Sequence, residues 1–282
     1  MLRSLFAGIS GLRVNQTMLD VTGNNIANAN TIGFKSSTTV FQDTLSQMLT
    51  AGSAASGGLG GTNPIQIGLG VQVAATNTNF NQGSNETTGG PTDMMINGDG
   101  MFVVQHGNET TYTRAGAFTW DGTGMLVSPG GGRVQGYTTF DATGLHTGGL
   151  TDIKLPANNG ATPPSDLASY EIGRDGKLTC TFEDGSKKVV AQIAIADFSN
   201  PMGLARAGET SFTVTPNSGA AQLGVVGEGS RGTLTTGALE MSNVDLAAEF
   251  TNLILAQRGF QASSRVITTS DQVLEDLVNI KR

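Results

Sequence analysis

A seven-residue repeat of apolar positions runs through both ends of this chain. Near the N-terminus it passes through Leu2, Leu5, Ile9, Leu12, Gln16, Leu19, Gly23 and Ile26, and near the C-terminus through Leu246, Phe250, Leu253, Gln257, Phe260, Ser264, Ile267, Asp271, Leu274 and Val278. Steps that alternate between three and four residues are typical of a helix that packs lengthwise on another helix. The repeat predicts an N-terminal helix within 1–30 and a C-terminal helix within 241–282 that pair as a coiled-coil-like unit. The alternative is that two ordinary globular helices match the repeat by chance.

The C-terminal helix has a recognisable start. Ser242 is the expected N-cap, because Asp245 follows three residues later as in a capping box. The helix can run to Lys281, which makes it roughly 57 Å long at 1.5 Å per residue. A helix of this length needs a partner along most of it, and the N-terminal helix is the obvious candidate.

Between the two ends the apolar residues alternate with polar ones, as in half-buried strands. Short runs such as "MFVVQ", "KLTCTF" and "VVAQIAIADF" are separated by turn sequences such as "NGDG" and "EDGS". We therefore predict an α+β protein, in which a mainly antiparallel β-domain over 65–240, in one or two lobes, is flanked by the terminal helices. Residues 31–64, which include a Gly- and Ser-rich stretch at 51–63, are the predicted connector, and 157–166 form an exposed loop.

Composition excludes several kinds of partner. The net charge of -7 argues against nucleic acid and against an anionic membrane surface. No run approaches the roughly 20 apolar residues that span a bilayer, and no cleaved signal peptide is expected. Cys180 is the single cysteine, which excludes an intrachain disulfide, and its alternation with Leu178 and Phe182 predicts a buried side chain.

The sequence offers little for catalysis. His106 and His146 stand in Gly-rich surroundings without a second metal ligand at a suitable spacing. Residues 227–232, "GEGSRG", match a dinucleotide-binding fingerprint, but a strand-like stretch follows where that site needs a helix. We therefore predict a protein that is not an enzyme and that has no cofactor and no metal.

The stretch "GNNIANANTIGFKS", residues 23–36, is predicted to form a junction directly after the first helix. The side chains of Asn24, Asn25 and Asn28 can hydrogen-bond the backbone groups that are left free where a helix stops. Asn, or Gly33, can adopt the left-handed conformation of a sharp exit, while Phe34 packs outside the helical repeat.

This junction stretch resembles the signature of the flagellar rod and hook family of axial proteins, in which it ends the N-terminal helix. The chain's closing stretch, which begins "TGALEMSNVDLAAEF" at Thr236, is similar to that family, as are "GTNPIQIGLGVQVA", "YTRAGAFT" and "QIAIADFSNPMGL". The similarity covers both ends and about two-thirds of the chain. Residues 61–104 and 192–204 look most like hook members of the family.

The resemblance implies a structural subunit of the flagellar hook, a hollow helical tube that transmits torque from rod to filament. Its partners would be copies of itself, the neighbouring rod, hook-cap and hook–filament junction proteins, and the flagellar type III export apparatus. The chain would leave the cell unfolded, without signal cleavage, and act in an extracellular or cell-envelope appendage. Phe41 and Leu45 fit the Phe-x-x-x-apolar export element of the family.

Two features of the chain favour a different member of the same family. Hook proteins are commonly longer, whereas this chain has only residues 144–166 where an extra outer domain would be inserted. Its size, and a segment near 46–64, are closer to the distal rod protein, whose equivalent segment stiffens the rod. The distal rod protein is therefore the second reading. An unrelated secreted fibre or adhesin is the alternative outside the family, and it would carry a cleaved signal.

Overall fold

A computed structural model describes residues 2–54, 60–140, 148–158 and 166–280. His146, part of the connector and most of the loop at 157–166 lie outside the described residues. The contacts divide the chain into two compact units. We call residues up to 27, 37–79 and from 244 onward the helical unit, and residues 28–36 and 80–243 the β unit. Helices at both ends and a mainly antiparallel β-domain between them confirm the predicted fold class.

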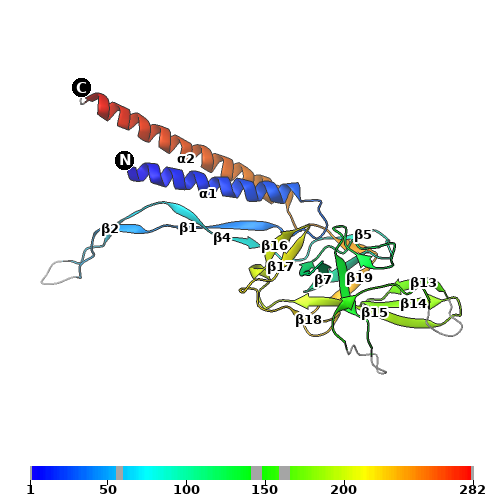
Figure 1. The fold of residues 1–282 in the computed structure, drawn as a ribbon. Coiled ribbons are helices and arrows are strands. Elements are labelled where there is room, and N and C mark those ends of the chain that lie inside the picture. The colour runs from blue at the N-terminus through cyan, green and yellow to red at the C-terminus, as the bar shows by residue number, and fades with distance from the viewer. Residues whose placement is uncertain (1, 55–59, 141–147, 159–165, 281–282) are drawn as a thin grey trace. The chain divides into compact units, whose positions relative to one another are not determined.

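The helical unit contains two long helices. α1 (Leu2–Ala27) and α2 (Leu246–Ile280) run antiparallel and side by side (Figure 1). The N-cap of α2 is Asp245, whose Oδ1 accepts hydrogen bonds from the backbone N–H groups of Ala247 (2.9 Å) and Ala248 (3.3 Å). The predicted cap at Ser242 is therefore wrong. A carboxylate at the positive end of the helix dipole makes Asp245 the better cap.

The line of contact between α1 and α2 is made of small residues. Gly8 lies against Ile267, Gly11 lies against Ser263, and an added Cβ at Gly259 would come within 2.5 Å of Asn15 Oδ1. The hydroxyls of Ser4 and Ser270 are 3.2 Å apart. The helices pair as the repeat predicts, but small residues bring them close along a neighbouring stripe. Gly259, unfavourable in an isolated helix, leaves room here for the Asn15 side chain.

A long two-stranded ribbon completes the helical unit. β1 (Ser37–Asp43) pairs with β4 (Val71–Thr78), and β2 (Ser46–Thr50) pairs with β3 (Ile65–Gly68), both antiparallel. The backbone N–H of Val71 donates to Ser10 Oγ on α1 (3.3 Å). The contacts thus group residues 37–79 with the helices, where the sequence predicted a connector over 31–64 and a β-domain that begins at 65.

The β unit is built on one antiparallel sheet with shorter pairs beside it. The main path runs in the order β13 (Leu167–Ile172), β14 (Lys177–Phe182), β15 (Lys187–Asp197), β11 (Arg133–Tyr137), β7 (Met101–His106), β8 (Glu109–Thr113), β17 (Ser211–Thr213) and β16 (Ala205–Gly208). The strands that join this path are β9 (Thr119–Trp120), β10 (Leu126–Val127), β12 (Thr151–Asp152) and β18 (Gln222–Val225). Separate pairs are β6 (Met94–Asn97) with β19 (Thr233–Thr236), and β5 (Asn85–Thr87) with β20 (Ala238–Glu240). A 3-10 turn, η1, spans Pro201–Gly203.

Two apolar clusters fill the β unit. Phe102, Ile195 and Cys180 belong to the larger cluster, and Val103 and Phe212 belong to the smaller one. Alternate residues of β7 enter different clusters, because successive side chains of a strand point to opposite faces. Cys180 is fully buried, as predicted, and burial raises the pKa of its thiol.

The "GEGSRG" stretch forms turns between β18 and β19 and is followed by a strand, so it lacks the helix of a dinucleotide site. Among the described helices, none has the length and apolarity needed to cross a bilayer.

Candidate assembly surfaces and the buried junction

The segment that follows α1 is held in the β unit by a buried lysine. The side chain of Lys35 is only 1% exposed. Its ammonium Nζ donates to Glu240 Oε1 at 2.7 Å and to the carbonyl oxygen of Asn81 at 2.8 Å. The segment before α2 supplies Glu240, at the end of β20. One ion pair therefore joins two stretches that are 205 residues apart in the sequence.

Glu240 is the centre of this cluster. Its carboxylate, which is fully buried, also accepts from Arg114 Nη1 at 3.3 Å and from the backbone N–H of Gly83 at 2.9 Å. Arg114 in turn donates from Nη2 to the carbonyl of Gly98 at 2.7 Å. Two buried cations share one carboxylate, and burial, which disfavours their charged forms, lowers the pKa of Lys35 and of Arg114. Removal of the carboxylate would leave Lys35 without an anionic partner and Arg114 with only the electrostatic attraction of Asp99.

Gly33 and Phe34 place Lys35 in this cluster. Gly33 has φ +67, and a Cβ on it would lie 2.5 Å from the backbone nitrogen of Ala115, so both its conformation and its surroundings require glycine. Its N–H donates to the carbonyl of Glu240 (2.8 Å). Phe34 is buried, and the guanidinium of Arg206 lies 4.9 Å from its ring centre.

Asn25 is the centre of a second buried hydrogen-bond cluster, which lies in the helical unit. Its Nδ2 donates to the carbonyl of Ser37 and to Glu249 Oε1, both at 2.8 Å, and its Oδ1 accepts from the N–H of Ser37 at 3.0 Å. One buried amide therefore joins the end of α1, the start of β1 and the first turn of α2. Of the other junction residues, Asn24 is exposed, and Asn28 Oδ1 accepts from Thr31 Oγ1 at 3.1 Å.

The predicted seam residues are divided between half-buried and exposed positions. Half-buried are Leu5, Leu12, Leu19, Ile26, Leu253, Ile267 and Leu274; exposed are Ile9, Leu246, Phe250, Phe260 and Val278. On α2 the buried positions Glu249 and Ala256 stand one residue before the predicted Phe250 and Gln257. A shift of one residue rotates the contact face by about 100° and turns Phe250 outward.

Further apolar residues are exposed beside this seam. On the helices they are Phe6, Ile254, Leu255, Val266, Val273, Leu277 and Ile280, and on the ribbon they include Met48, Leu49, Ile65 and Ile67. The predicted export pair, Phe41 on β1 and Leu45 just after it, is also exposed, Leu45 to 82%. Apolar patches of this extent are typical of interaction surfaces.

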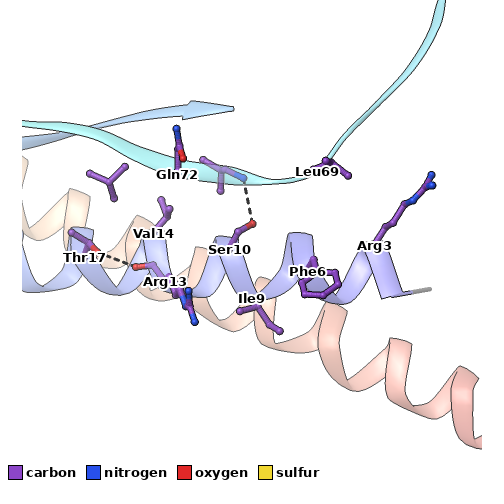
Figure 2. A pocket seen from close by; sticks show the side chains of 11 residues that line it. Arg3, Phe6, Ile9, Ser10, Arg13, Val14, Thr17, Leu69 and Gln72 are labelled. Carbon is purple, nitrogen blue, oxygen red and sulfur yellow. Dashed lines mark hydrogen bonds between the residues drawn. The ribbon is translucent and has the colours of Figure 1, made fainter. Parts of the chain in front are cut away.

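A groove of about 590 Å³ separates one side of α1 from the start of β4. Its lining includes Phe6, Val14, Leu69 and Val71, with Arg3 and Arg13 at the sides. Figure 2 shows the Ser10 side chain directed at the strand, where its hydroxyl meets the N–H of Val71. The groove is therefore apolar inside and carries positive charge.

Among the described residues, no group of three His, Cys, Asp or Glu side chains is placed to hold a metal ion. The hydrogen bonds of the polar clusters described above run between their own members and to backbone groups, and Arg114 Nε is a buried nitrogen without a hydrogen-bond partner. The surfaces left for function are the exposed apolar faces of the helices and ribbon, and the groove.

Comparison with known proteins assigns the family. Three family profiles match the chain: "Flagella basal body rod protein" at residues 5–35, "Flagellar hook protein FlgE/F/G D1 domain" at 95–180, and "Flagellar basal body rod FlgEFG protein C-terminal" at 235–280. The flagellar basal-body rod protein FlgG of Bacillus subtilis is 45% identical over 283 residues, which cover all of both chains. The chain belongs to the flagellar rod and hook protein family. It is a structural subunit of the flagellar axis.

The alignments with rod and hook relatives differ in length. FlgG of Caulobacter vibrioides is 34% identical over 278 residues, with 97% of each chain covered. The hook protein FlgE of Borreliella burgdorferi is 29% identical over 441 residues, with all of both chains covered. At least 159 positions of that alignment have no residue of this chain, which has 282. The comparisons favour the rod reading over the hook reading that the sequence phrases suggested.

The ion cluster was missed by sequence reasoning. Lys35 and Glu240 stand inside the two stretches that carry the family resemblance, "GFKS" and "TGALE", yet neither was assigned a role. The available signal was a charged residue directly next to apolar or glycine neighbours in both stretches. Glu249, between Ala248 and Phe250, and Arg114, before Ala115 and Gly116, carried the same signal and were also missed.

Proposed function

We propose that this chain is a subunit of the distal rod of the flagellar basal body. The observation that carries this proposal is the end-to-end alignment with a rod protein at 45% identity and equal length. The connection between β11 and β13 supports it, because its described residues contain only the short strand β12 and no inserted domain.

In this function the chain polymerises into a hollow tube, with the terminal helices at the inner core and the β unit at the outer wall. The exposed apolar residues of the helices become buried when neighbouring copies cover them, which supplies the free energy of assembly. The export apparatus secretes the chain unfolded and without signal cleavage, and Phe41 and Leu45 form the recognised element. The role is structural, without catalysis and without a cofactor.

The ribbon has a part in the same assembly. An isolated two-stranded ribbon is marginally stable in water, and this one exposes large apolar side chains on β2 and β3. Adjacent copies that cover these side chains would hold the ribbon in place. Such packing contacts between subunits would stiffen the tube, as a rod requires.

A gene deletion tests the choice between rod and hook. Basal bodies isolated from the deletion strain should carry truncated rods, and the unsubstituted chain supplied in trans should restore full length. Complete rods that lack only the hook would overturn the rod assignment. Normal basal bodies with normal hooks would overturn the axial function altogether.

A further inference from the structure

We propose that the groove between α1 and β4 of one copy binds the C-terminal end of α2 from a second copy. The inference rests on the proposed function, because it requires copies of the chain to assemble. It adds which segment meets which surface. The features that carry it are the length of α2, the distribution of its side chains, and the charge of the groove.

The end of α2 extends past its partner helix. Ser4 lies opposite Ser270 in the antiparallel pair, so the described start of α1 at Leu2 lies opposite residue 272. The residues from Val273 to Ile280 continue beyond that point, about 12 Å further at the α-helical rise. Figure 1 shows this end of α2 projecting beyond the start of α1. We call residues 273–280 the overhang.

The overhang is amphipathic. Val273, Leu277 and Ile280 fall on one arc of the helix, with Leu274 and Val278 beside them, and four of these five side chains are at least 48% exposed. Asp271 and Asp276 flank the two edges of the arc, at about 100° per residue. Residues 271–280 contain three acidic side chains and no basic one, and the basic residues Lys281 and Arg282 follow them in the sequence. The overhang therefore presents an apolar stripe with negative borders.

The groove presents the complementary surface. Phe6, which is 66% exposed, forms part of an apolar lining, while Arg3 and Arg13 bring positive charge to it. The lining on α1 extends from Arg3 to Thr17, about 21 Å of helix, which is long enough for the overhang. Apolar burial between basic and acidic borders supplies both affinity and a defined orientation.

A glycine shapes the groove where the strand meets α1. Gly70, directly before β4, has φ +127, and a Cβ there would lie 2.3 Å from Ser10 Oγ. Glycine at this position lets the strand meet α1 through Ser10 while Leu69 and Val71 line the groove beside it. The overhang of the same copy cannot reach the groove, because it continues straight past the start of α1 and away from Thr17. An overhang bound in this groove must therefore belong to a second copy.

Cysteine cross-linking tests this pairing inside assembled particles. Chains with two substitutions, Leu277→Cys with either Phe6→Cys or Thr17→Cys, replace the wild-type chain, and isolated basal bodies are oxidised with copper phenanthroline. Each copy then links to two neighbours, so at least one of the two pairs should give a ladder of dimers, trimers and larger species on a non-reducing gel. The native Cys180 does not interfere, because its side chain is fully buried.

The matched control moves the second cysteine by two residues. Asn279 is exposed like Leu277 but lies about 200° away around the helix axis, on the polar side. Asn279→Cys combined with the same groove cysteines should give no ladder. Intact particles without a ladder from either Leu277 pair, or with an equal ladder from Asn279, would overturn the docking and leave the rod function standing. Absence of the unsubstituted chain from the basal body would overturn the function itself.

Discussion

The two units of this chain differ in how far they bury their apolar side chains. In the β unit, large residues of the strands, such as Phe102 and Ile195, are fully buried in apolar clusters. In the described part of the helical unit, Val14 and Ala256 are the buried apolar residues. Twenty of the 24 large apolar side chains that the structure exposes belong to the helical unit. The same chain thus contains a completed core and an incomplete one.

This difference separates what the monomer can do from what the polymer must do. Burial of apolar surface contributes about 25 cal/mol per Å², and the β unit obtains this contribution within one copy. The helical unit leaves its apolar faces in water, so its ordering depends on neighbouring copies. Stability of the β unit should therefore be independent of assembly, and stability of the helical unit should not.

Limited proteolysis of the soluble monomer should show the largest difference. Trypsin sites at Arg258 and Arg265 lie exposed on α2, whereas Lys35 and Arg114 are buried in the β unit. Cleavage at the exposed sites needs only local opening, so it should be faster by on the order of a thousandfold than cleavage at the buried sites. Because trypsin cuts after Lys and Arg, mass spectrometry of the digest should show a stable fragment near 14–258, which begins after the exposed Arg13 and ends at Arg258. Helices as resistant as the β unit would contradict the comparison, and the assembled rod should protect both.

Removal of the buried carboxylate should have the next largest effect. Glu240→Ala leaves the ammonium of Lys35 and the guanidinium of Arg114 buried without their anion. The free energy of unfolding of the β unit should fall by about 3–5 kcal/mol, as measured by urea denaturation followed by near-UV circular dichroism. Glu86→Ala on the adjacent strand β5 is the matched control, because Glu86 is exposed, and it should cost under about 0.5 kcal/mol. Similar losses for both variants would show that the cluster does not contribute specifically to the stability of the β unit.

Periodicity explains which parts of the fold were predictable. The heptad steps identified both helices, and alternation identified the meander β13–β14–β15, because each signal is local. The positions on α2 that contact α1 could not be predicted to within one residue. Small residues such as Gly8 and Gly259 decide the face by allowing close approach, and they carry little weight in a search for apolar repeats.

The junction illustrates the limit for the site. Its glycine and amides could be interpreted locally, and Gly33 does have a left-handed backbone. The partners of Lys35 are distant in sequence, at Asn81 and Glu240, and no spacing rule connects them. Interactions that depend on sheet topology become visible only when the strands are in place.

A polar substitution on the exposed face of α2 should separate assembly from monomer stability. Phe260→Asp places a charge at a position that is already 38% exposed in the monomer. The free energy of unfolding of the β unit should change by less than about 0.5 kcal/mol, while incorporation into rods, followed by immunoblots of isolated basal bodies, should be lost. Gln261→Asp, the adjacent exposed position, is the control for charge alone. Normal rods from Phe260→Asp would show that Phe260 is not part of the assembly surface.

The smallest effect is the pH dependence contributed by Lys35. Burial lowers its pKa below the ordinary value of 10.5, against the opposing attraction of Glu240. Between the lowered pKa and 10.5 the unfolded chain holds a proton that the folded chain has released, so the contribution of Lys35 to the free energy of unfolding rises with pH in this window. Burial raises the pKa of Cys180, Tyr112 and Tyr137, whose contributions fall with increasing pH, but these groups are common to wild type and Lys35→Met. The stability of wild type relative to Lys35→Met, measured by urea denaturation at a series of alkaline pH values, should therefore rise toward pH 10.5. A difference that stays flat or falls would mean that the charged ammonium is held in the β unit without a desolvation cost.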